Sequence, residues 1–124
     1  MTRVVVDTNA LLLPFLDGTD LRSELENALG AVDLVVPSSV RTELSALQAG
    51  EGRTARAARA AQRLVADATQ AATELPGDDG VLDVARRLGA TVLTNDKRLQ
   101  AECRRSGLRV VASRGHGRLW APFG

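Results

Sequence analysis

The sequence is poor in cysteine, lysine and aromatic residues, and each shortage excludes a class of protein. Cys103 is the only cysteine, which excludes an internal disulfide and favours a reducing compartment. Aromatic residues make up 2% of the chain and tyrosine is absent, so bases of a single strand find no aromatic platform on which to stack. Lys97 is the only lysine, so arginine carries almost all of the positive charge.

Long apolar segments are also missing. No apolar run approaches the roughly 18–20 residues of a membrane-spanning helix, and the start of the chain lacks the pattern of a secretory signal. The formal net charge is +1, so any binding to nucleic acid must depend on locally clustered charge. We therefore expect a soluble, cytoplasmic protein that does not bind membranes, built as one domain over residues 1–124.

Short apolar segments alternate with longer amphipathic ones along the chain. The short segments are typical of buried parallel strands, and helices between them would cover both faces of the sheet, which makes an α/β protein. The longest predicted helix covers residues 54–73, and Pro14 is expected to break or kink any helix near it. The predicted strands are residues 3–6, 33–36, 90–94 and 108–112, with a short edge strand near residues 119–120 as a fifth.

Acidic residues follow the predicted strands. Asp7 comes directly after the first strand and Asp96 after the third, while Asp79 begins a helix expected to pack nearby. Glu43 lies about one turn into the helix that leaves the second strand. Ligands of an open α/β sheet bind beyond the carboxyl ends of its strands. We therefore expect these carboxylates to lie on one rim of the sheet.

Such a cluster of carboxylates is costly unless protons or cations neutralise it. Two like charges about 4 Å apart repel by about 4 kcal/mol at an effective dielectric near 20. Oxygen ligands favour Mg²⁺ or Mn²⁺ over zinc, and these ions suit phosphodiester hydrolysis because they activate the attacking water and stabilise the leaving oxygen. Each acid taken alone is more simply explained as a turn, cap or exposed helix residue.

Four motifs carry these acids and follow one another along nearly the whole chain: residues 4–11 (VVVDTNAL), 36–44 (VPSSVRTEL), 77–82 (GDDGVL) and 92–96 (VLTND). Together, in this order and spacing, they resemble the PIN-domain ribonucleases, which include VapC-type toxins and archaeal relatives of rRNA-maturation nucleases. The resemblance implies a three-layer α/β/α sandwich with a central, mostly parallel sheet of four to five strands. It also implies an endoribonuclease that depends on Mg²⁺ or Mn²⁺.

The resemblance assigns roles to particular residues. Asn9 and Thr94 would be polar supports that orient ligands or waters. Asp78 is an alternative to Asp79, and we favour Asp79 because it comes immediately before the apolar helical residues. Gly80 departs from the family's usual pattern, and we expect it to loosen the start of that helix. The catalytic and metal-binding residues implied by the resemblance are Asp7, Glu43, Asp79 and Asp96.

Two groups of arginines are candidates for contacts with an RNA backbone. Arg53 and Arg56 belong to a stripe along the long helix, although a solvated face explains them more simply. Arg98 and Arg104 belong to the segment from residue 97 to residue 118, which holds seven lysines and arginines against few acids. We expect this second group to be the better site for phosphate contacts.

Several roles stay open at this point. The nuclease would be either the toxin of a type II toxin–antitoxin pair, with an antitoxin protein as its partner, or a housekeeping enzyme that processes rRNA or other RNA. A non-catalytic RNA-binding protein of the same fold is a further alternative. A phosphoryl-accepting receiver domain also gathers acids on a sheet rim, but Lys97, the only lysine, directly follows a candidate ligand. Family members usually pair, so we expect a homodimer formed through the apolar residues 11–16.

Overall fold

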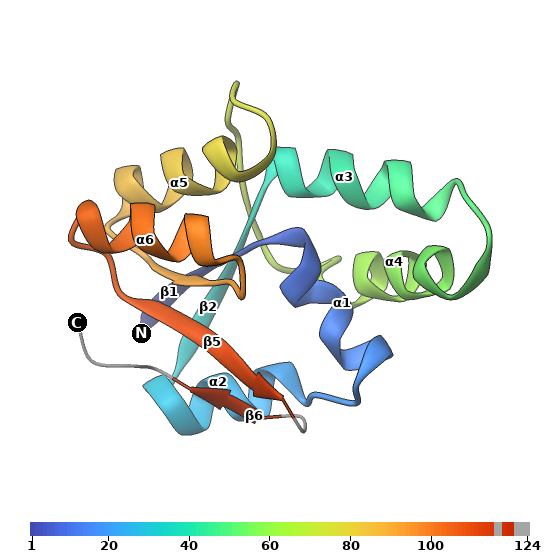
Figure 1. Cartoon of the computed structure of the whole chain (residues 1–124), viewed down its shortest axis with the longest axis horizontal. Helices are drawn as coiled ribbons and strands as arrows, with labels where there is room; N and C mark the ends of the chain where they lie inside the picture. Colours follow the sequence, from blue (N-terminus) through green and yellow to red (C-terminus); the bar gives the residue numbers. More distant parts are fainter. Residues whose placement is uncertain (116–117, 121–124) are drawn as a thin grey trace.

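A computed structural model describes residues 1–115 and 118–120 of the chain (Figure 1). Within this part, one sheet has the strand order β3-β2-β1-β4-β5-β6. Neighbouring strands from β3 to β5 are parallel, and β6 is antiparallel to β5. The strands are β1 (Thr2–Val6), β2 (Val32–Pro37), β3 (Thr69–Ala71), β4 (Thr91–Leu93), β5 (Val110–Gly115) and β6 (Arg118–Trp120).

Helices cover both faces of this sheet and make the fold a three-layer α/β/α sandwich. From β1 to β3 the chain moves outward in one direction along the sheet, and from β3 it returns past β1 to reach β4. Since crossovers between parallel strands are right-handed, this reversal places the helices before β3 on one face and those after β3 on the other. Figure 1 shows α5 and α6 lying together on one side, away from α2. The helices are α1 (Thr8–Leu16), α2 (Leu21–Leu29), α3 (Ser38–Gln48), α4 (Gly52–Leu64), α5 (Gly77–Leu88) and α6 (Lys97–Arg105).

The central strand β1 forms the middle of the hydrophobic core. Val4, Val5 and Val6 are completely buried, because β2 and β4 flank the strand and helices lie over both of its faces. A continuous apolar run is what such a strand requires. The strands predicted at residues 33–36, 90–94 and 108–112 are confirmed as β2, β4 and β5, and the short edge strand predicted near residues 119–120 is confirmed as β6.

One predicted helix is wrong over its second half. The helix expected over residues 54–73 ends at Leu64, and the chain then forms the edge strand β3. Thr69 pairs with Val35 of β2, and its hydroxyl donates a hydrogen bond to Asp33 Oδ1 at 2.7 Å. Pairing with the sheet therefore overrides the helix propensity of the alanine-rich sequence, and the sheet gains a parallel strand that the sequence did not predict.

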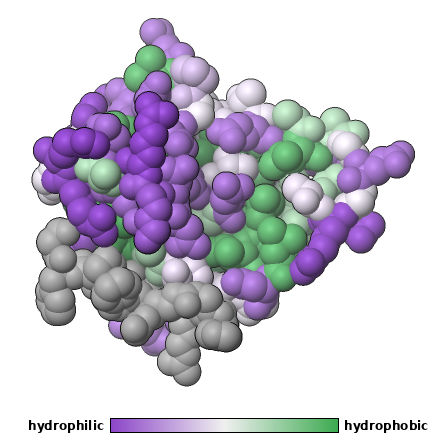
Figure 2. Space-filling view, in the orientation of Figure 1, coloured by the Kyte–Doolittle hydropathy of each residue, from purple (hydrophilic) through white to green (hydrophobic). Residues whose placement is uncertain are grey.

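The first helix differs from expectation at two points. Pro14 does not break it, since α1 continues past this residue. Leu11 and Leu12, expected to belong to a surface for pairing two copies, are buried in the core, whereas Phe15 is 38% exposed. Figure 2 shows hydrophobic side chains gathered on this face of the molecule, where α1 lies in Figure 1. A homodimer through the exposed remainder of α1 stays a prediction. Among the described residues, no helix has the length and apolar character needed to cross a bilayer.

Candidate active site at the rim of the sheet

Asp7 lies where β1 ends and α1 begins, at the carboxyl edge of the sheet. Its backbone N–H donates to Leu93 O of the neighbouring strand β4 at 3.2 Å. Its Oδ1 accepts a hydrogen bond from the N–H of Ala10 at 2.8 Å, so the side chain caps α1. Its Oδ2 accepts a hydrogen bond from the hydroxyl of Thr94. Asp7 is only 6% exposed, so the fold holds this carboxylate in one orientation.

Thr94 connects Asp7 to Asp96. The Thr94 side chain is fully buried, and its Oγ1 also accepts a hydrogen bond from the N–H of Asp96 at 3.0 Å. Its carbonyl accepts a hydrogen bond from Gln100 Nε2 at 2.8 Å. Asp96 in turn caps α6, because its Oδ1 accepts the N–H of Leu99 at 2.8 Å. These contacts are those expected of a polar support between two strand ends.

The carboxylates at this rim perturb one another electrostatically. Burial raises the pKa of Asp7, and the nearby charges of Asp78 and Asp96 raise it further, against the lowering effect of its hydrogen bonds. Burial also raises the pKa of Asp78, and Asp96 and Asp79 add to this increase. Asp7, Asp78 and Asp96 therefore share one region of negative potential, formed by the ends of β1 and β4 and the first turn of α5.

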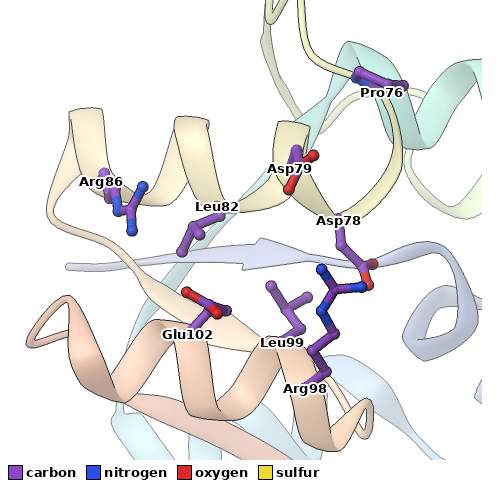
Figure 3. Close-up of a pocket in the computed structure, with 8 residues that line it drawn as sticks. All are labelled: Pro76, Asp78, Asp79, Leu82, Arg86, Arg98, Leu99 and Glu102. Atoms are coloured by element: carbon purple, nitrogen blue, oxygen red, sulfur yellow. The ribbon is translucent and has the colours of Figure 1, made fainter.

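The structure distinguishes between the two adjacent acids of α5. Asp78 raises the pKa of Asp7, whereas Asp79 is absent from the groups that perturb Asp7. Figure 3 shows Asp78 directed toward Arg98 of α6, while Asp79 lines the same pocket from the first turn of α5. The assignment of Asp79 as a ligand thus stays a prediction, and the geometry favours Asp78 for that position.

Glu43 and Asn9 are exposed at the margin of this region. Glu43 lies on α3 and lines a cleft of about 250 Å³ together with the first residue of α5, Gly77. A Cβ built on Gly77 would lie 4.0 Å from Glu43 Oε1, so Glu43 lies near the start of α5. Asn9 lies on the first turn of α1, and within the described part of the chain its side chain makes no hydrogen bond.

Gly80 allows α5 to pack closely against α3. A Cβ at this position would lie 2.5 Å from Leu75 O and 2.8 Å from Ser39 Cβ, distances too short for any larger residue without movement. Ser39 Oγ also donates a hydrogen bond to Gly77 O at 3.4 Å. The missing side chain permits a close approach of α5 to α3, and the effect of Gly80 on the firmness of the helix start stays a prediction.

A polar clip holds the loop between β3 and α5, and sequence reasoning missed it. Ser38 Oγ accepts the N–H of Thr73 at 2.9 Å and donates to its carbonyl at 3.1 Å. The Thr73 hydroxyl donates to Asp83 Oδ2 at 2.8 Å, and Arg87 donates to the same oxygen at 3.2 Å. Ser38 lies 35 residues before Thr73, so no local pattern in the sequence indicates their contact. A second missed feature is the buried hydroxyl of Thr8, which has no hydrogen-bond partner among the described residues.

The candidate RNA-binding arginines lie in different surroundings. Arg53 donates a hydrogen bond to Leu16 O at the end of α1, at 2.6 Å, which is a structural contact. Arg56 and Arg104 are exposed on α4 and α6. Arg98 lines a pocket of about 520 Å³ between α5 and α6 (Figure 3). The complete lining of this pocket is Pro76, Asp78, Asp79, Leu82, Arg86, Arg98, Leu99 and Glu102.

The donor set at this rim fits a hydrated divalent cation. Within the described residues, no three Asp, Glu, His or Cys side chains converge closely enough to hold one ion together, so direct binding by all four predicted acids is not what this arrangement provides. Mg²⁺ usually binds through one or two carboxylates and keeps several of its waters. Asp7, Asp78 and Asp96 offer oxygen donors in a shared negative field. They therefore fit Mg²⁺ or Mn²⁺ with the remaining contacts made through water.

The fold and the site together define an α/β protein with a cluster of acids at the carboxyl edge of its sheet. The chain belongs to the PIN-like domain family. The model of that family, described as a PIN like domain, matches residues 4–116. The curated protein ribonuclease VapC9 from Archaeoglobus fulgidus is 32% identical over 107 residues, which span 86% of this chain and 78% of that protein. The family resemblance drawn from the four motifs is confirmed.

Two solved structures share the fold. The PIN domain endonuclease Utp24 superimposes with a TM-score of 0.75 at 23% identity, covering 94% of this chain and 88% of that one. A domain of a functionally unknown protein from Methanocaldococcus jannaschii superimposes with a TM-score of 0.65 at 16% identity, covering 93% of each chain. At these identities the two structures establish the architecture, and the predicted α/β/α sandwich is confirmed.

Proposed function

We propose that the chain is an endoribonuclease that hydrolyses RNA phosphodiester bonds with the help of Mg²⁺ or Mn²⁺. The observation that carries this proposal is the buried carboxylate of Asp7, held between strand ends and facing the charges of Asp78 and Asp96. Membership of the PIN-like family supports a nuclease, and the ribonuclease named among its relatives supports RNA as the substrate.

Each acid has a distinct part in this proposal. Asp7 and Asp96 supply the fixed carboxylates, and Asp78 supplies the third from α5, with Asp79 as the alternative. Glu43 completes the site from α3 through water. When bound, the cation lowers the pKa of a coordinated water and stabilises the negative charge that develops on the phosphate oxygens.

The chain's own residues prepare the site for this chemistry. Asp7 uses one lone pair of each oxygen to accept hydrogen bonds from Ala10 and Thr94, so further lone pairs stay available for a cation. Thr94 fixes the distance between Asp7 and Asp96, because it donates to one and accepts from the other. Fixed donors of this kind need little rearrangement when charge develops in the transition state.

The test is cleavage of a structured RNA with Mg²⁺ or Mn²⁺, in the presence and absence of a chelator. We expect activity that the chelator abolishes and that Asp7→Asn and Asp96→Asn each lower by at least about 100-fold. Asp67→Asn is the matched control, because this side chain is 89% exposed and, among the described residues, its ion pair is a 4.0 Å contact with Arg22. Full activity of the Asp7→Asn variant would contradict the proposed site.

Two biological roles are consistent with this activity, and the VapC9 relative favours the first. As the toxin of a toxin–antitoxin pair, the protein would arrest growth when expressed alone and would be neutralised by an antitoxin protein. As a processing nuclease, it would do neither. Growth arrest by the wild type but not by the Asp7→Asn variant would support the toxin, whereas unaffected growth with active enzyme would support RNA processing.

A further inference from the structure

The carboxylate of Asp78 faces a positive charge that comes from another helix. Arg98 lies in the first turn of α6, two residues after Asp96. It lines the pocket between α5 and α6 together with Asp78. Figure 3 shows the two side chains pointing toward one another across this pocket. The start of α6 therefore supplies both a candidate cation ligand and a cation of its own.

Arg98 differs from Arg86, the other arginine that lines this pocket, because no hydrogen bond or ion pair within the described residues holds its side chain. Arg86 lines the same pocket, but its Nε donates to Ser106 Oγ at 2.9 Å. Arg105 forms an ion pair with Glu102 at 3.1 Å. For Arg98, the described part of the chain offers no hydrogen bond and no ion pair within 4.0 Å. Arg98 is exposed, so its side chain has room to move.

Arg98 interacts electrostatically with the acids of the rim, Asp78 in particular. Burial and the charge of Asp96 raise the pKa of Asp78, and Arg98 opposes them by lowering it. Arg98 thus partly neutralises the region where the proposed cation would bind. Two cations beside one carboxylate repel each other, so the presence of a divalent ion would weaken the hold of Asp78 on Arg98.

We propose that Arg98 is an internal counter-ion of the acidic rim, which a divalent cation displaces from Asp78 and which then contacts an RNA phosphate. This inference rests on the proposed function, since it concerns the same cation. A guanidinium suits the contact with an RNA phosphate because its planar N–H donors bind two phosphate oxygens at once. The displacement would couple metal loading to the availability of a phosphate contact at the edge of the site.

The test is the affinity for Mn²⁺ alone, measured by titration calorimetry on the full chain without RNA. We expect Arg98→Gln to bind Mn²⁺ about threefold to fivefold more tightly than the wild type, the size expected for an exposed ion pair. Arg86→Gln removes the same charge from the same pocket and should change the affinity by less than about twofold. Arg98→Lys, which keeps the charge, should stay close to the wild type. The gain in Mn²⁺ affinity of Arg98→Gln should shrink at high salt, where exposed charges are screened.

A double-mutant cycle isolates the electrostatic coupling between Arg98 and Asp78. In an Asp78→Asn background the counter-ion has lost its partner, so adding Arg98→Gln should tighten Mn²⁺ binding less than it does in the wild type. A simple folding defect in Arg98→Gln would weaken Mn²⁺ binding, which is the opposite sign. At saturating Mn²⁺, Arg98→Gln should raise KM for RNA more than Arg86→Gln does.

The possible outcomes separate the inference from the proposed function. Absence of Mn²⁺ binding in the wild type would overturn the proposed function. Mn²⁺ binding by the wild type, with Arg98→Gln no tighter than Arg86→Gln, would overturn the counter-ion alone and leave the nuclease standing. Tighter Mn²⁺ binding by Arg98→Gln with an unchanged KM would overturn the phosphate contact.

Discussion

The two sides of the acidic rim differ in how firmly the fold holds their carboxylates. Asp7 is buried, and hydrogen bonds from Ala10 and Thr94 occupy both of its oxygens. Asp78 and Glu43 are exposed on the first turns of α5 and α3. Ends of adjacent strands fix the first side, whereas packing between two helices and a loop fixes the second.

This difference suggests that the two sides of the rim have different roles in the proposed enzyme. A carboxylate fixed between β1 and β4 gives a cation one invariant position. Carboxylates on exposed helix starts can adjust to the substrate, and the nearby Arg98 adds a charge that is free to move. The comparison predicts that changes on the buried side will cost activity, while changes on the exposed side will affect metal affinity or packing.

Among variants that keep every acid of the rim, the largest effect is expected at Thr94. Thr94→Val keeps the shape of the side chain but removes the hydroxyl that joins Asp7 to Asp96. We expect cleavage of RNA to fall by about 10- to 100-fold, as for other groups that orient metal ligands. The measurement is kcat/KM with a model RNA at saturating Mn²⁺.

A second hydrogen bond from a threonine hydroxyl to an aspartate provides the control for this variant. Thr69 donates to Asp33 Oδ1 at 2.7 Å on the exposed edge strand β3. Thr69→Val should leave kcat/KM within about twofold of the wild type, because an exposed hydrogen bond contributes little. Equal losses in the two variants would mean that Thr94 has no special part in orienting the acids.

The next effect concerns the packing that supports the exposed side. Gly80→Ala places a Cβ against Leu75 O and Ser39. Overpacking of this kind costs about 1–3 kcal/mol, and the gain in helix propensity of about 1 kcal/mol offsets only part of it. We expect a net loss of up to about 2 kcal/mol in the free energy of unfolding, measured with urea. Gly50→Ala is the control, since its Cβ would meet Leu47 O at an ordinary 3.5 Å; a loss no larger than this control's would contradict the close approach.

The two adjacent acids of α5 test which of them serves the proposed cation site. Asp78→Asn removes the charge that perturbs Asp7, so the affinity for Mn²⁺ should fall by about tenfold, within the range for groups at a metal site. Asp79→Asn should change the affinity by less than about twofold. The reverse order would restore the assignment favoured by the sequence, and calorimetry without RNA distinguishes the two outcomes.

Local patterns in the sequence predict the buried side of the rim well. The valines of β1 followed by Asp7 identify a strand that delivers a carboxylate to the edge of a sheet. Asp96, which is exposed at the same rim, is likewise found from the strand before it. Both placements depend on neighbours in sequence, and the four motifs together identify the family.

The exposed side depends on contacts between distant residues, and the sequence predicts it poorly. Asp78 and Asp79 are adjacent at a helix start, and only the packing of α5 on α3 decides which of them faces Asp7. Gly80 looks like a weak helix former until Ser39 is placed against it. β3 was missed because its residues follow an alanine-rich helix, and pairing with β2 alone reveals the strand.

The smallest predicted effect is a gain in stability from Asp7→Asn, the substitution that is expected to lower activity. Burial raises the pKa of Asp7 in the folded protein above its value of about 3.9 in an unfolded chain. The folded state therefore prefers the protonated acid, so wild-type stability is lost as the pH rises through the folded pKa. Asp7→Asn mimics the protonated form, keeps an oxygen that can accept the N–H of Ala10, and escapes this loss.

In metal-free buffer at pH 7, we expect Asp7→Asn to raise the free energy of unfolding by about 1 kcal/mol, or Tm by about 3 °C. As the pH falls well below about 3.9, both folded and unfolded wild type become protonated at this residue, so the advantage of the variant should vanish. Thermal unfolding of both proteins from pH 3 to pH 8 measures the difference. An advantage that is constant across this range would show that the gain has another origin than the charge of Asp7. Added Mn²⁺ should reverse the order at pH 7, because a bound cation stabilises only the protein that keeps the carboxylate.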